Sequence, residues 1–88
     1  MYTLVLSEKV IRQLKKIDKS SARLIISWIE KNIDNCNDPR LHGKSLKGNL
    51  SEYWRYRVGD YRVICSIEDN ELVVIAIAVG HRRDIYNS

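Results

Sequence analysis

The fold follows from one stretch of the sequence, Tyr53-Trp54-Arg55-Tyr56-Arg57-Val58-Gly59-Asp60-Tyr61-Arg62-Val63-Ile64. Residues that favour β-strands lie on both sides of Gly59-Asp60, a pair that suits a two-residue β-turn. The stretch therefore predicts an antiparallel hairpin between residues 53–58 and 61–67. A second turn at Asp69-Asn70 leads into the apolar run 72–79, and together these three strands predict an antiparallel meander.

Side chains alternate between the two faces of a strand, and the predicted hairpin separates them by type. One face is apolar and is expected to join the core: Trp54, Tyr56, Val58, Tyr61, Val63 and Cys65. The other face carries Arg55, Arg57 and Arg62, with Arg57 directly across from Arg62 if the turn is tight. Such a like-charged pair costs a few tenths to about 1 kcal/mol, which a bound anion would relieve. A single arginine of this kind is more often an ordinary solvated residue, whereas three on one hairpin favour a cationic binding surface.

The N-terminal half predicts a strand over residues 2–6 followed by two helices that pair antiparallel and cover one face of the sheet. Ser7 is the expected N-cap of the first helix, and Ser20 or Ser21 that of the second, which should end at about Asp34. The apolar positions of the first helix are Val10, Ile11, Leu14 and Ile17. Those of the second are Ala22, Ile25, Ile26, Trp28, Ile29 and Ile33. The fold class is therefore α+β.

Residues 35–49 contain the only proline and two glycines of the chain, and they predict a loop that ends with Lys44 and Lys47. The run 72–79 is apolar at every position, so this strand should lie in the interior of the sheet and be at least partly covered on both faces.

Length and composition predict a single domain over residues 1–88, because 88 residues suffice for one small core and not for two.

Fifteen Lys and Arg residues against eleven Asp and Glu residues give a net charge of +4. This balance favours a polyanionic partner such as nucleic acid, although a merely basic surface is the plain alternative. No run approaches the roughly 20 apolar residues of a membrane span and no leader is visible, so a cytoplasmic protein without a membrane partner is expected.

The last residues, Val79-Gly80-His81-Arg82-Arg83-Asp84-Ile85-Tyr86, hold groups that can titrate, carry fixed charge and stack on a base. Cleavage of RNA by its own 2′-hydroxyl needs a base, cations for the phosphate and an acid for the leaving oxygen. Arginine supplies only the cation, whereas His81 suits proton transfer because an imidazole titrates at about 6.5. Tyr86 could stack on a base or act as acid or base. The alternatives are backbone hydrogen bonding for His81 and simple packing for Tyr86.

No metal or other cofactor is expected. Cys36 and Cys65 lack a neighbouring Cys or His at metal-ligand spacing, which predicts reduced thiols. The sequence also shows no phosphate-binding glycine loop, paired carboxylates or nucleophilic triad.

Three stretches in this order resemble the RelE/ParE superfamily of bacterial type II toxin-antitoxin toxins, and most of all its RelE branch. They are Lys44-Ser45-Leu46-Lys47-Gly48, the hairpin 53–64 and the C-terminal stretch 79–86. The resemblance spans essentially the whole chain and implies a microbial-RNase-like fold. It further implies an mRNA interferase, an endoribonuclease that cuts mRNA in the ribosomal A site without a metal and so inhibits translation. A cognate RelB-like antitoxin would wrap and block it in a toxin-antitoxin hetero-oligomer.

The resemblance assigns roles residue by residue. The positions that it marks for catalysis are Arg55, Arg57, Arg62, His81, Arg82 and Tyr86. Apart from the resemblance, Lys44 and Lys47 lie in the loop before the hairpin and could contact backbone phosphates, although a loop lysine is more often simply solvated. Arg83 is a further candidate RNA contact. Some RelE proteins have lysines where this chain has Arg55 and Arg57, and only a lysine could serve there as a base. His81 and Tyr86 are therefore expected to transfer the protons. The sequence does not reveal which of them is the base and which is the acid.

Two other functions remain as alternatives. A ParE-like protein would poison DNA gyrase and cut no RNA, but such relatives generally lack the full set of basic and proton-transfer residues, so His81 and Tyr86 disfavour it. The chain could also be a non-catalytic partner of an antitoxin.

Overall fold

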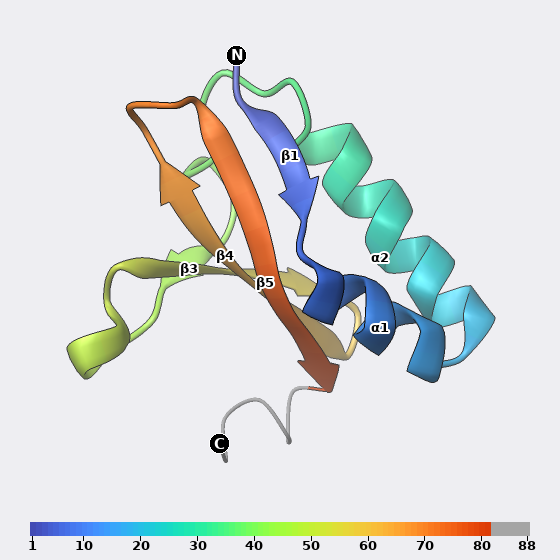
Figure 1. Cartoon of the computed structure of the whole chain (residues 1–88). Helices are drawn as coiled ribbons and strands as arrows, with labels where there is room; N and C mark the ends of the chain where they lie inside the picture. The colour runs from blue at the N-terminus through green and yellow to red at the C-terminus, as the bar shows by residue number, and fades with distance from the viewer. Residues whose placement is uncertain (82–88) are drawn as a thin grey trace.

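The computed structural model describes residues 1–81, in which two α-helices pack on a five-stranded sheet. The helices are α1 (Glu8–Lys16) and α2 (Lys19–Asn32), and a short 3-10 helix spans Gly48–Leu50. The strands are β1 (Thr3–Leu6), β2 (Lys44–Ser45), β3 (Tyr53–Val58), β4 (Tyr61–Glu68) and β5 (Val73–His81). They lie in the order β1-β5-β4-β3-β2, with β1 parallel to β5 and the other pairs antiparallel. Figure 1 shows both helices on the same side of the sheet, which confirms the predicted α+β fold.

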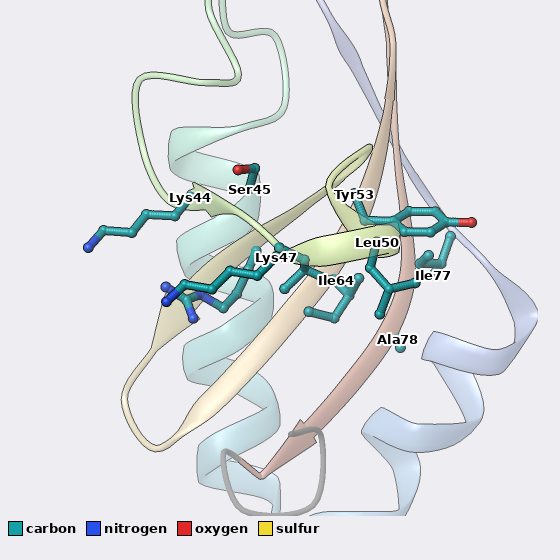
Figure 2. A pocket seen from close by; sticks show the side chains of 10 residues that line it. Lys44, Ser45, Lys47, Leu50, Tyr53, Ile64, Ile77 and Ala78 are labelled. Carbon is teal, nitrogen blue, oxygen red and sulfur yellow. The ribbon is translucent and has the colours of Figure 1, made fainter. Parts of the chain in front are cut away.

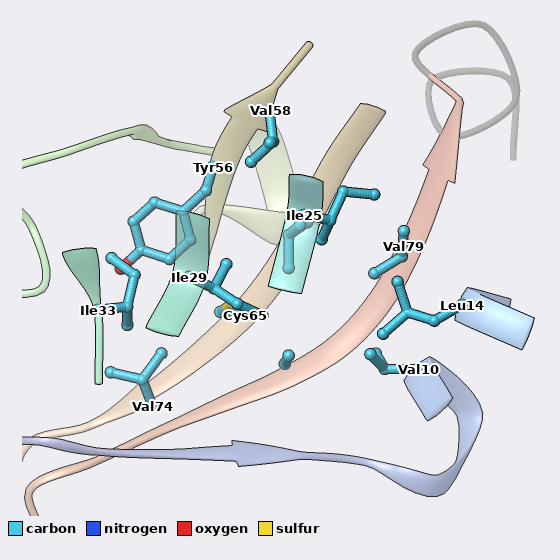
Figure 3. Close-up of a cluster of buried hydrophobic side chains, with 12 residues drawn as sticks. Val10, Leu14, Ile25, Ile29, Ile33, Tyr56, Val58, Cys65, Val74 and Val79 are labelled. Carbon is cyan, nitrogen blue, oxygen red and sulfur yellow. The ribbon is translucent and has the colours of Figure 1, made fainter. Parts of the chain in front are cut away.

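The hydrophobic core lies between the helices and the sheet (Figure 3). The helices and the residue after α2 contribute Val10, Leu14, Ile25, Ile29 and Ile33, and the strands contribute Tyr56, Val58, Val63, Cys65, Val74, Ala76 and Val79. The predicted apolar face of the hairpin is therefore confirmed. Ile11 departs from the prediction: it is 41% exposed, because the residue next to Val10 is turned about 100° around the helix from the buried stripe.

The N-cap of α1 is the predicted residue, whereas the N-cap of α2 is not. Ser7 caps α1 as predicted, since its hydroxyl oxygen accepts a hydrogen bond of 3.2 Å from the Val10 N–H. The prediction that Ser20 or Ser21 caps α2 is wrong, because Asp18 is the N-cap. The Ser20 hydroxyl and the Ser21 N–H both donate to Asp18 Oδ2, each at 2.9 Å. A carboxylate suits the positive end of a helix, and the bond from the Ser21 backbone is the largest cause of the lowered pKa of Asp18.

The hairpin has the predicted register. Its Cα partners include Val58 with Tyr61, Arg57 with Arg62, Tyr56 with Val63 and Arg55 with Ile64. Gly59 has a φ of +60°, which the tight turn requires and which glycine adopts without steric cost. The turn therefore fixes which residues reach each face of the sheet.

Strand β5 lies between β1 and β4, as its uniformly apolar sequence predicted. Its pairing with β4 contains a bulge: Ile64 pairs with Ala78 and the next residue, Cys65, pairs with Ala76, which leaves Ile77 as an extra residue. A bulge re-aims side chains locally. Ile77 and Ala78 thus both line the side of the sheet away from the helices, while Ala76 remains in the core.

The loop predicted over residues 35–49 contains a strand that the sequence did not reveal. Strand β2 pairs with β3 through Lys44 opposite Arg55 and Ser45 opposite Trp54, and so forms an edge of the sheet. Gly43, just before it, has a φ of +77°.

Side chains from the sheet hold the loop that leads into β2. The Tyr56 hydroxyl donates to the Pro39 carbonyl oxygen and the Trp54 Nε1–H donates to that of His42, both at 2.6 Å. Arg40 donates two bonds, of 2.9 and 3.0 Å, to the carboxylate of Asp69, which lies in the β4–β5 turn. These bonds are the largest cause of the lowered pKa of Asp69. Because the loop is fixed at several points, Lys44 enters the sheet in a defined position.

Among residues 1–81, no helix combines the length and the apolar character that a membrane crossing needs.

Candidate nucleic-acid interface on the open face of the sheet

The face of the sheet opposite the helices, which we call the open face, carries two rows of paired residues. The first row crosses four strands through Lys44, Arg55, Ile64 and Ala78. The second crosses three strands through Arg57, Arg62 and Gly80. The structure therefore brings together residues from β2 and from the hairpin that the sequence singled out separately.

Each row places two cations directly opposite one another. Lys44 pairs with Arg55, and Arg57 pairs with Arg62. Directly opposed side chains have Cβ atoms only about 5 Å apart, and like charges at that separation are destabilising. Two adjacent pairs of this kind concentrate positive charge on one part of the open face, and such a concentration favours binding of an anion.

A groove of about 810 Å³ lies over the first row. Figure 2 shows Lys44 and Lys47 on one side of the groove, Ile64 in the middle, and Tyr53, Leu50, Ile77 and Ala78 on the other side. Among the described residues, the lining consists of Lys44, Ser45, Leu46, Lys47, Leu50, Tyr53, Arg55, Ile64, Ile77 and Ala78. These residues provide apolar surface and three cations, and none of them is acidic. The size of the groove is within the range of small-molecule and cofactor sites.

The three hairpin arginines differ in exposure. Arg57 is exposed and Arg55 is half-buried, but Arg62 is only 5% exposed. One Arg62 Nη1–H donates to the Tyr61 carbonyl oxygen at 3.2 Å. Gly80 lies across from Arg62 in β5 and puts no side chain beside it. The alternative of an ordinary solvated arginine therefore does not hold for Arg62, which is the least exposed of the three and is hydrogen-bonded to the backbone.

His81 does not share the open face with the arginines. It pairs with Tyr61, whose side chain packs toward the core, and the two rings meet edge to face at 5.6 Å. Its imidazole thus lies on the helix side of the sheet, at the C-terminal end of β5.

The remaining predicted site residues, Arg82, Arg83 and Tyr86, lie outside the described residues.

Sequence reasoning missed the apolar half of the groove. Tyr53 lies two residues before Arg55 on β3 and therefore on the same face, so strand alternation alone could have placed it there. Ile77 depends on the bulge, which has no clear sequence signature. Leu50 depends on the conformation of the segment before β3.

Burial favours the protonated forms of two titratable groups in the core. Burial raises the pKa of the Cys65 thiol to about 12, and burial also raises that of the Tyr56 hydroxyl. In the part of the chain that the structure describes, no three His, Cys, Asp or Glu side chains gather in a way that could hold a metal ion. The open face itself presents Lys44, Arg55 and Arg57, whose positive charges can bind an anion.

Comparison with known proteins gives one family. A family model described as the ParE toxin of the type II toxin-antitoxin system parDE matches residues 4–86. Toxin RelE3 of Methanocaldococcus jannaschii is 35% identical over 80 residues, which cover 88% of this chain and 86% of that toxin. The toxin-antitoxin complex RelBE2 of Mycobacterium tuberculosis contains a chain with a TM-score of 0.77 and 26% identity, with 92% and 91% of the two chains covered. The isolated Escherichia coli RelE toxin has the same fold, with a TM-score of 0.70, 18% identity, and 99% and 93% coverage.

Proposed function

Because the chain belongs to the ParE toxin family of type II toxin-antitoxin systems and to the RelE branch of the RelE/ParE superfamily, we propose that it is a ribosome-dependent mRNA endoribonuclease. The reaction is attack of a ribose 2′-oxygen on the adjacent phosphorus with loss of the 5′-oxygen. A base takes the proton of the 2′-hydroxyl and an acid protonates the leaving oxygen. The products carry a 2′,3′-cyclic phosphate and a 5′-hydroxyl, and translation stops because the message is cut.

One observation carries this proposal: the open face opposes cation to cation in two adjacent rows, beside a groove whose lining within residues 1–81 includes no acidic side chain. The backbone phosphates of RNA match that charge. Arginine is suited to the cleavage step because its planar fork can bind two phosphate oxygens and stays charged.

The residues divide by role. We assign binding of the scissile phosphate and stabilisation of its developing charge to Arg55, Arg57, Arg62 and Arg82, and further backbone contacts to Lys44, Lys47 and Arg83. Tyr86 and His81 are the proposed proton-transfer groups. Because the His81 ring lies on the helix side of the sheet at the end of β5, His81 can take part only if its ring turns toward the open face. Among the assigned residues, Arg62 is the best preorganised in the described residues, because a buried guanidinium needs little rearrangement as charge develops.

An antitoxin is the proposed protein partner. The M. tuberculosis relative is a chain of a toxin-antitoxin complex, and its match covers 92% of this chain. By analogy, a RelB-like antitoxin would bind this protein and block its activity in a hetero-oligomer. A cation-lined face also favours an antitoxin segment that carries carboxylates.

Sequencing of transcript ends after brief induction tests the proposed activity. New ends should appear within translated frames, at a preferred position in the codon, and should vanish when translation initiation is blocked beforehand. A ParE-like gyrase poison would instead leave transcripts intact and inhibit supercoiling of plasmid DNA by purified gyrase. Absence of both effects, with normal growth after induction, would indicate a non-catalytic antitoxin partner.

Substitution of His81 by Gln tests the proposed proton transfer. A general acid or base contributes about 10²- to 10⁴-fold, so the single-turnover cleavage rate should fall at least 100-fold. A fall below about threefold would assign His81 to packing against Tyr61 instead.

A further inference from the structure

The groove on the open face combines two kinds of surface that a nucleotide needs. Lys44, Lys47 and Arg55 supply positive charge along one part of its lining. Tyr53, Leu50 and Ile77 supply aromatic and aliphatic surface along another. A phosphate alone would need only the cations. The apolar half of the groove therefore suits a ligand that also carries an apolar or aromatic group, as a nucleotide does.

The ring of Tyr53 is available to a ligand. Tyr53 is half-buried on the groove wall, and among residues 1–81 its side chain makes no hydrogen bond or ring contact with other aromatic residues. Other aromatic side chains near the sheet are engaged. Tyr56 donates to Pro39, Trp54 donates to His42, and Tyr61 packs against His81.

Position along the strand links the ring to the cations. Tyr53, Arg55 and Arg57 lie at alternate positions of β3, so their side chains project from the open face about 7 Å apart. Lys44 lies opposite Arg55 on the neighbouring strand. A ligand that follows β3 therefore meets an aromatic ring first and a line of cations next.

We propose that Tyr53 stacks on one nucleobase of the bound RNA, with Leu50 and Ile77 as the apolar floor and with Lys47 and Arg55 on the adjoining phosphates. This assignment rests on the proposed function and extends it to a base-binding subsite beside the scissile phosphate. An aromatic residue can stack on any base and so adds affinity without sequence preference. An aliphatic residue of similar size contributes little stacking affinity. Tyr53 is thus a substrate-positioning residue that acts on binding rather than on proton transfer.

A binding experiment tests the subsite without relying on cleavage. The probe is a 2′-O-methyl hexanucleotide, which lacks the attacking hydroxyl, with 2-aminopurine at one position at a time. When the toxin is added to this probe, stacking should quench the fluorescence of 2-aminopurine at one of the positions. Tyr53→Leu should abolish that quenching and weaken binding about 5- to 150-fold, the range expected for one base stacked on an aromatic ring. Tyr53→Phe should retain both.

Tyr2→Phe and Tyr2→Leu are the controls, because Tyr2 is a half-buried tyrosine that packs against the core on the helix side of the sheet. Tyr2→Phe shows separately the effect of losing the hydroxyl bond of 2.6 Å to Asp69. Both should leave oligonucleotide affinity unchanged. Equal affinity of Tyr53→Leu and the unaltered toxin, or no quenching at any position, would overturn the subsite. Weaker antitoxin binding by Tyr53→Leu at unchanged oligonucleotide affinity would also overturn it and would assign the groove to the antitoxin.

The same variants on mRNA-programmed ribosomes separate this inference from the proposed function. If the subsite exists, Tyr53→Leu should raise the KM for the programmed ribosome while kcat changes little. Oligonucleotide binding that depends on Tyr53, without any cleavage on ribosomes, would support the subsite and contradict the proposed nuclease. Cleavage that is indifferent to Tyr53 would support the nuclease and contradict the subsite.

Discussion

The Gly43→Ala variant is expected to lose about 2–5 kcal/mol of its free energy of unfolding, the largest effect on stability that we predict for a single methyl group. A Cβ atom at Gly43 would collide with the Arg55 carbonyl oxygen and would lie 2.8 Å from Trp54 Nε1. Overpacking of this kind costs about 1–3 kcal/mol, and the positive φ of +77° adds about 1–2 kcal/mol for a residue with a side chain. Since a small domain has only about 5–15 kcal/mol in total, this loss is a large fraction of its stability.

Gly48→Ala is the matched control for this effect. Gly48 also has a positive φ, of +68°, but a Cβ atom there would meet nothing within 4 Å. Only the backbone strain of about 1–2 kcal/mol should appear. Urea denaturation followed by tryptophan fluorescence measures both variants. Equal losses for the two would contradict the close contact between Gly43 and β3, and with it the fixed entry of Lys44 into the sheet.

The Arg62→Ala variant is expected to lose growth inhibition, with a fall in cleavage rate of about 10²- to 10³-fold. This is the size of effect that follows removal of one preorganised group from a developing negative charge. Arg62→Lys keeps the charge and loses the planar fork, so its rate should lie between those of the Ala variant and the unaltered toxin. Single-turnover cleavage on mRNA-programmed ribosomes measures these rates, and growth after induction reports the consequence in cells.

Two controls separate loss of chemistry from loss of fold. Because Arg62 is buried, the melting temperature and the antitoxin affinity of each variant must be measured alongside its activity. Arg12→Ala removes an exposed arginine of α1, on the helix side, whose contact with Glu8 at 3.9 Å contributes little. It should leave cleavage unchanged. Full toxicity of a folded Arg62→Ala protein would remove Arg62 from the proposed site.

The sequence predicted those parts of the fold that depend on local rules. The Gly59-Asp60 turn fixes the hairpin register, and a period of two then places Tyr56 in the core and Arg57 on the other face. The helix stripes followed from spacing in the same way. These features could be predicted from the sequence because they do not depend on contacts with distant segments.

The features that the sequence did not reveal depend on tertiary contacts. Strand β2 has only two residues, and its place at the edge of the sheet depends on a loop held by Tyr56, Trp54 and Arg40. The bulge at Ile77 depends on how β5 fits against β4. For α2, several residues that can cap a helix stand side by side, and propensity alone did not choose Asp18.

In the candidate site too, local rules predicted some features, whereas those that depend on tertiary contacts were not predicted. Alternation put Arg55, Arg57 and Arg62 on one face, but it could not show that Arg62 is buried or that Lys44 lies opposite Arg55. Chain proximity suggested that His81 would accompany the arginines, whereas its pairing with Tyr61 turns its ring to the other side of the sheet. The face that a residue reaches at the end of a strand depends on every bulge before it, and that count is not visible in the sequence.

The chemistry of the cleaved ends tests the central claim most directly. Purified full-length toxin should cut mRNA on ribosomes with an empty A site, and the products should carry a 2′,3′-cyclic phosphate and a 5′-hydroxyl, at a rate that Arg62→Ala lowers at least 100-fold. Ends with a 5′-phosphate, or no cleavage by a folded and growth-inhibiting toxin, would contradict a site in which fixed cations on the open face stabilise the phosphate during 2′-hydroxyl attack.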